Sequence, residues 1–104
     1  MSDPILKEIV NRLSQEFHPS KMYLFGSRAT GLAQADSDYD LLLVVKEISS
    51  GKFERMRRAR RALNGLGITA DVFVYSEEEF NEWKDELSSI PETALREGLE
   101  LQVG

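Results

Sequence analysis

Residues 26–45 read GSRATGLAQADSDYDLLLVV, and this stretch decides the fold that the rest of the chain accommodates. Five consecutive apolar residues close it, at positions 41–45, and leave no polar side to face water. They therefore predict a strand that is buried on both faces. Side chains two apart on a strand point to the same face, so Asp38 and Asp40 project together from the start of this strand.

The pair of carboxylates indicates a cation site. Two carboxylates held this close repel each other by about 4 kcal/mol at an effective dielectric constant of about 20. Protons or cations relieve such repulsion, and paired carboxylates are well placed to hold a divalent metal ion. The alternative is that Ser37-Asp38 forms a turn before the strand, which explains Asp38 but not the second aspartate within the strand.

Gly26-Ser27 favours the functional interpretation. It follows residues 22–25, a short apolar segment that predicts the end of an earlier strand. A strand, a Gly-Ser turn and a helix start at Ser27 together present backbone N–H groups to an anion. The whole pattern, G-S-x-x-x-G, then S-D-x-D-L and a later lone Asp71 on a strand, resembles the nucleotidyltransferases of the DNA polymerase β-like superfamily. At this length it resembles the minimal nucleotidyltransferase (MNT) group of prokaryotes, which includes the antitoxins of HEPN/MNT toxin–antitoxin systems.

Composition bounds the remaining possibilities. The 104 residues predict one domain over positions 1–104, with room for a single core. The chain has no cysteine and one histidine, which excludes a disulfide framework, a thiolate metal site and a zinc cluster. A net charge of −5 argues against general nucleic-acid binding. No signal-peptide pattern or membrane-length apolar run appears, so a cytoplasmic setting is expected.

The remaining elements are predicted by periodicity and capping signals. An amphipathic helix is expected over residues 3–17, a strand over 21–25, a helix over 52–64 and a third strand over 69–75. Ser76 to Glu79 forms a capping box that opens a helix through Phe80, Trp83 and Leu87, with Trp83 in the core. A last helix is expected over residues 91–97, followed by an edge strand over 99–103.

The predicted topology follows from where the motifs lie. The Gly-Ser turn ends the first strand, whereas the aspartates begin the second and third strands. These meet only if the first strand is antiparallel to the second and the second is parallel to the third. The helix over residues 52–64 supplies the crossover that a parallel pair needs. The fold class is therefore α/β: a small mixed sheet flanked by helices, which matches the polymerase β-like fold that the resemblance implies.

The resemblance also implies the chemistry. In it, Asp38 and Asp40 hold two Mg²⁺ ions about 3.5–4 Å apart, which Mn²⁺ could replace, and Asp71 completes the ion that activates the acceptor. Gly26 and Ser27 bind the phosphates of a nucleoside triphosphate, with Arg28 as an added cation. The family often has arginine where this chain has Thr30. Transfer of AMP from ATP to a tyrosine of a cognate HEPN toxin, which silences the toxin, is the activity expected on this basis.

Two alternatives stay open from the sequence. The protein could block a toxin by contact alone, or it could modify a small molecule such as an aminoglycoside with a homo-oligomer completing the site. The nucleotide and the acceptor cannot be read from the residues. The chain is short for holding both substrates, and no membrane or nucleic-acid partner is indicated.

Charge is segregated along the sequence. Residues 52–75 carry six cations against two carboxylates, a balance of +4, whereas residues 76–104 have a balance of −7. On a helical wheel, Arg60 lies between Phe53, Met56 and Leu63, in the stripe that is expected to face the sheet, and Arg55 and Arg58 point away. We expect Arg60 either to extend past the core edge or to face a triphosphate or an acidic partner. Segregated charge also favours a partner with complementary patches.

Overall fold

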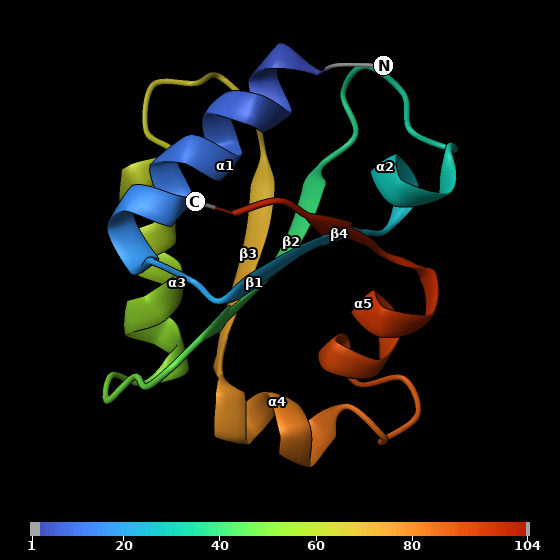
Figure 1. Cartoon of the computed structure of the whole chain (residues 1–104). Helices are drawn as coiled ribbons and strands as arrows, with labels where there is room; N and C mark the ends of the chain where they lie inside the picture. Colours follow the sequence, from blue (N-terminus) through green and yellow to red (C-terminus); the bar gives the residue numbers. More distant parts are fainter. Residues whose placement is uncertain (1–2, 104) are drawn as a thin grey trace.

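A computed structural model describes residues 3–103. The elements are α1 (Pro4–Phe17), β1 (Lys21–Phe25), α2 (Ser27–Thr30), β2 (Tyr39–Val45), α3 (Lys52–Ala62), β3 (Ala70–Ser76), α4 (Glu77–Trp83), α5 (Ile90–Glu97) and β4 (Leu99–Leu101). Figure 1 shows their arrangement. The predicted mixed α/β fold is confirmed, with element boundaries close to those expected from the sequence.

The sheet has the predicted strand directions. Its order is β3-β2-β1-β4, with β1 antiparallel to β2 and β4, and β2 parallel to β3. Helix α3 makes the crossover between the two parallel strands. The last strand is an edge strand, as expected; it pairs with β1 and spans only residues 99–101.

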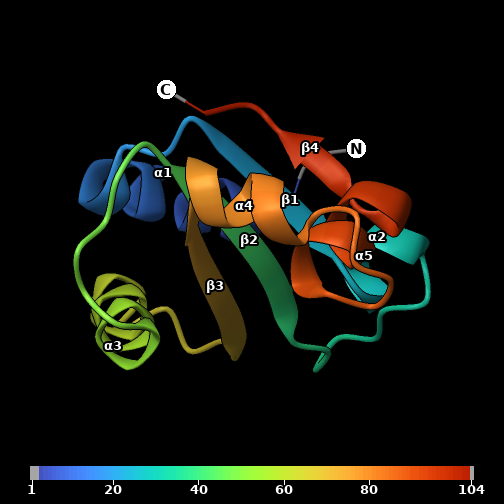
Figure 2. The ribbon, with the colours of Figure 1, turned by 90° about the horizontal axis from the view of Figure 1, so that it is seen from below.

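The sheet is covered on both faces, which explains the apolar run in β2. Helices α1 and α3 lie on one side, and α4 and α5 lie on the other (Figures 1 and 2). Leu41 and Leu43 pack with the α1 and α3 side chains, whereas Leu42 and Val44 pack with Phe80 of α4 and Ala94 of α5. A strand between two apolar layers needs apolar side chains at every position.

Helix α1 begins as predicted. Asp3 is the N-cap, and its Oδ1 accepts hydrogen bonds from the backbone N–H groups of Ile5 and Leu6, at 3.0 and 3.1 Å. Pro4 occupies the first turn, where its missing N–H costs nothing.

The predicted orientation of α3 is right for Leu63, which is buried, and wrong for the first turns of the helix. Phe53, expected to face the sheet, is 84% exposed, and Arg60 is exposed on the same side. Arg55, expected to point to solvent, is instead buried at 5% exposure, in line with Ala59 and Leu63. The helix is therefore rotated relative to the prediction, and the polar groups that Arg55 reaches give the reason.

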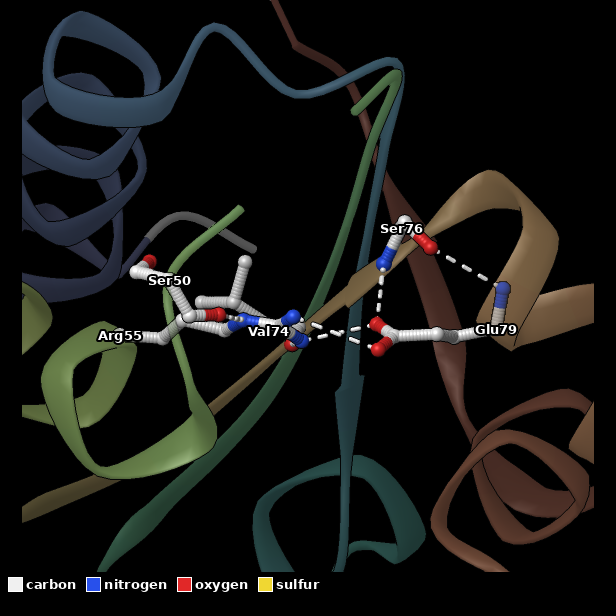
Figure 3. Close-up of polar contacts among 5 residues, drawn as sticks. All are labelled: Ser50, Arg55, Val74, Ser76 and Glu79. Carbon is white, nitrogen blue, oxygen red and sulfur yellow. Dashed lines mark hydrogen bonds and ion pairs between the residues drawn. The ribbon is translucent and has the colours of Figure 1, made fainter. Parts of the chain in front are cut away.

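Arg55 ties three segments together (Figure 3). Its Nε donates to the Ser50 carbonyl at 2.7 Å and its Nη1 donates to the Val74 carbonyl at 2.9 Å. Its Nη1 also lies 2.7 Å from Oε1 of Glu79 in α4. A buried guanidinium is tolerable only when it is paired and hydrogen-bonded in this way. These partners outweigh the apolar contacts that Phe53 would gain by turning inward.

The capping box of α4 is confirmed and takes part in this contact. Ser76 Oγ accepts from the Glu79 N–H at 3.0 Å, and Glu79 Oε1 accepts from the Ser76 N–H at 2.9 Å. The helix ends at Trp83 rather than continuing to residue 87. Trp83 is 43% exposed and Leu87 is 81% exposed, so the prediction that Trp83 belongs to the core is wrong. Phe80 alone supplies the buried aromatic ring of α4, stacked on Tyr23.

Candidate active site

The acidic residues lie at the edge where β2 and β3 begin. Asp40 is the second residue of β2 and its register partner on β3 is Asp71. Register partners on parallel strands point to the same face. The residues two positions further along each strand, Leu42 and Phe73, share that face, and both pack on the α4 and α5 side. Asp38 precedes β2 by one residue and is exposed. The topology therefore brings Asp40 and Asp71 together from positions 31 residues apart in the sequence.

The electrostatic environment of Asp40 is consistent with this placement. Burial raises the pKa of Asp40, and the negative charges of Asp71 and then Asp38 raise it further. The direction of the shift shows that the ionised form of Asp40 is held at a cost, which a proton or a cation would relieve.

The residues present fit a hard divalent cation in donor type. All three side chains offer carboxylate oxygens, the ligands that Mg²⁺ and Mn²⁺ prefer. Within residues 3–103, however, no three acidic or histidine side chains are grouped closely enough to form a ready-made metal site. Asp40 and Asp71 form the core of the candidate site, and Asp38 borders it.

Gly26 closes the site from the side of β1. It follows Phe25, which is the register partner of Asp40 on β1. Its φ of 73° and ψ of −157° lie in a region that is essentially restricted to glycine. A Cβ added at Gly26 would collide with Oδ2 of Asp40. The glycine is therefore required twice, by its backbone conformation and by the close approach of the carboxylate.

Ser27 and Arg28 begin the short helix α2. The Gly26 carbonyl accepts from the N–H groups of Ala29 and Thr30, at 3.0 and 3.2 Å, and this forms the turn. Gly31, in the left-handed conformation with φ 83°, ends the helix. Gly26 thus lies directly against the Asp40 carboxylate, and Ser27 follows it in the chain.

Arg28 has a structural environment that the sequence did not reveal. Its Nε and Nη2 donate to the Ser37 carbonyl at 3.0 and 2.8 Å, and Nη2 also reaches the carbonyls of Gln34 and Ala35. The guanidinium carbon lies 4.0 Å from the centre of the Tyr39 ring. Arg28 therefore holds the loop that leads into Asp38, and its predicted contact with a nucleotide stays a prediction.

Tyr39 is the residue whose role the sequence analysis missed. It lies between Asp38 and Asp40, is almost fully buried, and donates its hydroxyl to Asp3 Oδ2 at 2.9 Å. Asp3 thus caps α1 with one oxygen and holds β2 with the other. Burial raises the pKa of Asp3, but hydrogen bonds from Leu6, Tyr39 and Ile5 outweigh it and hold that pKa below its ordinary value. Strand alternation was the available signal, since it turns Tyr39 away from both aspartates and toward α1.

Among residues 3–103, no helix combines the length and the apolarity that crossing a bilayer would require.

Comparison with known proteins identifies the family of the chain. A family model described as a nucleotidyltransferase domain matches residues 6–103. No protein with curated annotation matches the chain.

Solved structures with the same fold were also found. A crystal structure assigned as a nucleotidyltransferase, from Sulfolobus solfataricus, is 28% identical with a TM-score of 0.64, over 93% of this chain and 76% of that one. A toxin–antitoxin structure with AMP-PNP is 17% identical with a TM-score of 0.58, over 94% of this chain and 73% of that one. At this lower identity, the likeness shows the fold alone.

Proposed function

The chain belongs to the nucleotidyltransferase domain family, and from this premise we propose that it transfers AMP from ATP to a hydroxyl group of a partner protein. The observation that carries the proposal is the pairing of Asp40 with Asp71 beside Gly26, where no side chain fits. This is one acidic centre with open backbone next to it, as is required when the acceptor hydroxyl bonds to the α-phosphorus of ATP and pyrophosphate leaves.

In this proposal Asp38, Asp40 and Asp71 would hold two Mg²⁺ ions, and the bound ions would neutralise charge on the reacting phosphate. Ser27 and the backbone at Gly26 bind the phosphates of the nucleotide, and Arg28 adds positive charge from the loop that it holds. Asp71, which is exposed and lies on the edge strand β3, accepts the proton of the attacking hydroxyl. Tyr39 and Asp3 fix the backbone between the first two carboxylates.

Three observations support a protein acceptor. The fold neighbour solved with AMP-PNP is a toxin–antitoxin structure. The acidic centre lies where β2 and β3 begin, and β3 is an edge strand, which leaves the centre open to a large acceptor. The basic stretch at 52–75 and the acidic stretch at 76–104 suit a partner with complementary charge. We therefore propose that the protein is an antitoxin and that its partner is a HEPN-type toxin modified on a tyrosine.

Mass spectrometry of the intact partner tests this function. The chain is co-expressed with the product of the adjacent gene, and the wild type is compared with the Asp38→Ala, Asp40→Ala double variant. The expected result is a partner that gains the mass of one AMP group only with the wild type. Arg61→Gln, a surface change away from the acidic centre, serves as the control and should transfer normally.

The alternatives predict different results in the same experiment. An antitoxin that acts by contact alone would neutralise the partner equally well as the double variant, with no change of mass. A small-molecule nucleotidyltransferase would leave the partner unmodified and would add AMP to an aminoglycoside supplied with ATP and Mg²⁺. Either result would refute transfer to a protein.

A further inference from the structure

The outer face of α3 carries apolar side chains where solvent would favour polar ones. Phe53, Met56 and Arg60 follow one another at helical spacing, and we call them the α3 stripe. Phe53 is 84% exposed and Met56 is 36% exposed. Since Arg55 turns the opposite side of the helix inward, Phe53 and Arg60 face solvent and Met56 is only partly covered. Large exposed apolar side chains grouped in this way are typical of an interaction surface.

Two cavities border the α3 stripe, and Met56 lines both. One, of about 280 Å³, is mainly apolar and lies against Phe73, Tyr75 and Ile90. The other, of about 640 Å³, lies between α3 and the start of β3 and has the size of a small-ligand site. Its apolar wall includes Leu63, Ile68 and Val72, and its polar wall includes Arg60 and Asn64.

The larger cavity borders one member of the acidic centre, at the edge strand β3, whereas Asp38 and Asp40 do not line it. Asp71, the register partner of Asp40, is one of the residues that line it. A molecule held against α3 in this cavity therefore lies next to a residue to which the proposed function gives a catalytic role.

Arg60 differs from the other arginines of α3 in having no carboxylate beside it. Arg55 pairs with Glu79 and Arg58 pairs with Glu16, at 2.7 and 3.0 Å. Arg57 and Arg61 both lie within 4.0 Å of Glu54. Among the residues that the structure describes, no acidic group comes within 4.0 Å of Arg60. Its guanidinium is therefore available to an external anion at the mouth of the cavity.

We propose that the α3 stripe and the larger cavity form the docking site for the acceptor, and that the acceptor is a polypeptide segment bearing a hydroxyl side chain next to a carboxylate. The proposal rests on the proposed function, because Asp71 is the point where docking and transfer meet. The apolar stripe binds the body of the segment, the cavity takes the hydroxyl-bearing side chain, and Arg60 pairs with the neighbouring carboxylate. The exposed ring of Phe53 extends the contact beyond the cavity, which favours a macromolecule over a small acceptor.

Synthetic peptides test the specificity. Transfer from ATP with Mg²⁺ is measured on two peptides that differ only in whether glutamate or lysine flanks a central tyrosine. The wild type should prefer the glutamate peptide by about fivefold in kcat/KM, as a partly exposed ion pair allows. Arg60→Glu should reverse the preference, whereas Arg57→Glu, the same change one turn earlier on α3, should keep it. Equal behaviour of the two variants would overturn the proposal.

A second pair of variants tests the apolar part. Phe53→Ser should raise the KM for the glutamate peptide with little change in kcat, because it removes docking surface only. Leu87→Ser removes an equally exposed apolar side chain away from α3, and should change neither. A loss that is the same in both variants would contradict a specific role for the α3 stripe.

Binding without transfer separates this proposal from the proposed function. The same glutamate peptide is titrated into labelled protein without ATP, and amide chemical shifts are followed by NMR. Shifts at Arg60, Gly65, Gly67 and Asp71 in this titration, with no AMP transfer once ATP and Mg²⁺ are added, would support the docking site and refute the proposed function for this peptide class. Transfer without shifts at these amides would overturn the docking site and leave the proposed function standing.

Discussion

Asp40 and Asp71 face each other across the parallel strands β2 and β3, one residue after each strand begins. Because both point to the same side of the sheet, their charges oppose one another in the partly buried space beside Gly26. The fold therefore holds two carboxylates together in a partly buried place, where their repulsion is costly. The first two predictions follow from this repulsion.

Asp40→Asn is expected to abolish nucleotidyl transfer and to stabilise the metal-free protein at pH 7. The amide keeps the size of the side chain and removes its charge, so it relieves repulsion from Asp71 and Asp38 and the cost of burial. Thermal unfolding in EDTA measures the gain, and transfer to the co-expressed partner measures the loss. A variant that retains transfer, or that unfolds at room temperature, would contradict this interpretation.

The gain in stability from Asp40→Asn should depend on pH. The folded pKa of Asp40 is raised, so the native state holds this proton more tightly than the unfolded chain, whose value is about 3.9. The penalty of ionisation therefore develops as the pH rises above about 3.9 and is complete above the folded pKa. Urea unfolding of both proteins between pH 4 and 7.5, without metal, should show two curves that converge toward acid. A constant separation would mean that Asp40 does not cause it.

Gly26→Ala is expected to destabilise the protein by about 1–3 kcal/mol and to remove transfer. A Cβ would be strained at this φ and ψ and would also displace the Asp40 carboxylate. Gly51→Ala is the matched control, since Gly51 has an ordinary φ of −72° and nothing lies within 4 Å of an added Cβ. Chemical denaturation of both variants checks the difference, and equal stabilities would refute the steric argument.

Arg55→Met is expected to lower the free energy of unfolding by about 1–3 kcal/mol, because it leaves the Ser50 and Val74 carbonyls without their donor and Glu79 without its cation. The expected loss of stability is smaller than for a fully buried ion pair, because about a third of the Glu79 side chain is exposed. Arg61→Met, an exposed change on the same helix, should cost less than about 0.5 kcal/mol.

The same substitution should alter the response to acid. A hydrogen bond from Arg55 holds the pKa of Glu79 below its ordinary value. The corresponding stability is present above the unfolded pKa and is lost as the pH falls through the folded one. Arg55→Met should therefore lose less stability than the wild type on acidification, as urea midpoints at pH 7 and pH 4 would show.

Tyr39→Phe is expected to weaken metal binding more than it weakens the fold. The change keeps the buried ring under Arg28 and removes only the hydroxyl bond to Asp3, which is worth about 1–2 kcal/mol. Loss of this restraint loosens the segment that spaces Asp38 from Asp40. Mn²⁺ binding, followed by electron paramagnetic resonance without nucleotide, should weaken in Tyr39→Phe and stay unchanged in Tyr23→Phe, a control at another buried tyrosine. Equal affinities would leave Tyr39 with a packing role only.

The sequence by itself determined the elements that carry the candidate site. An uninterrupted apolar run defined the buried strand β2, and the Gly-Ser and Asp-x-Asp motifs fixed the strand directions, since their residues meet in one topology only. The Asp3 cap and the Ser76–Glu79 capping box are local hydrogen bonds between residues two or three apart. Local signals of this kind are complete within a few residues of sequence, which is why they could be predicted.

Tertiary structure decided which side of each helix faces inward and what the arginines do. Arg55 is buried and Phe53 is exposed because a carbonyl on β3 and a carboxylate on α4, 19 and 24 residues away, meet the guanidinium. Arg28 and Tyr39 are likewise placed by polar partners that the folded chain brings near. Arg28 donates to the Ser37 carbonyl, and the Tyr39 hydroxyl donates to Asp3, 36 residues away in the sequence. A helical wheel ranks side chains by hydrophobicity alone. It cannot include the free energy of satisfying a charged group through partners that only the folded chain brings together.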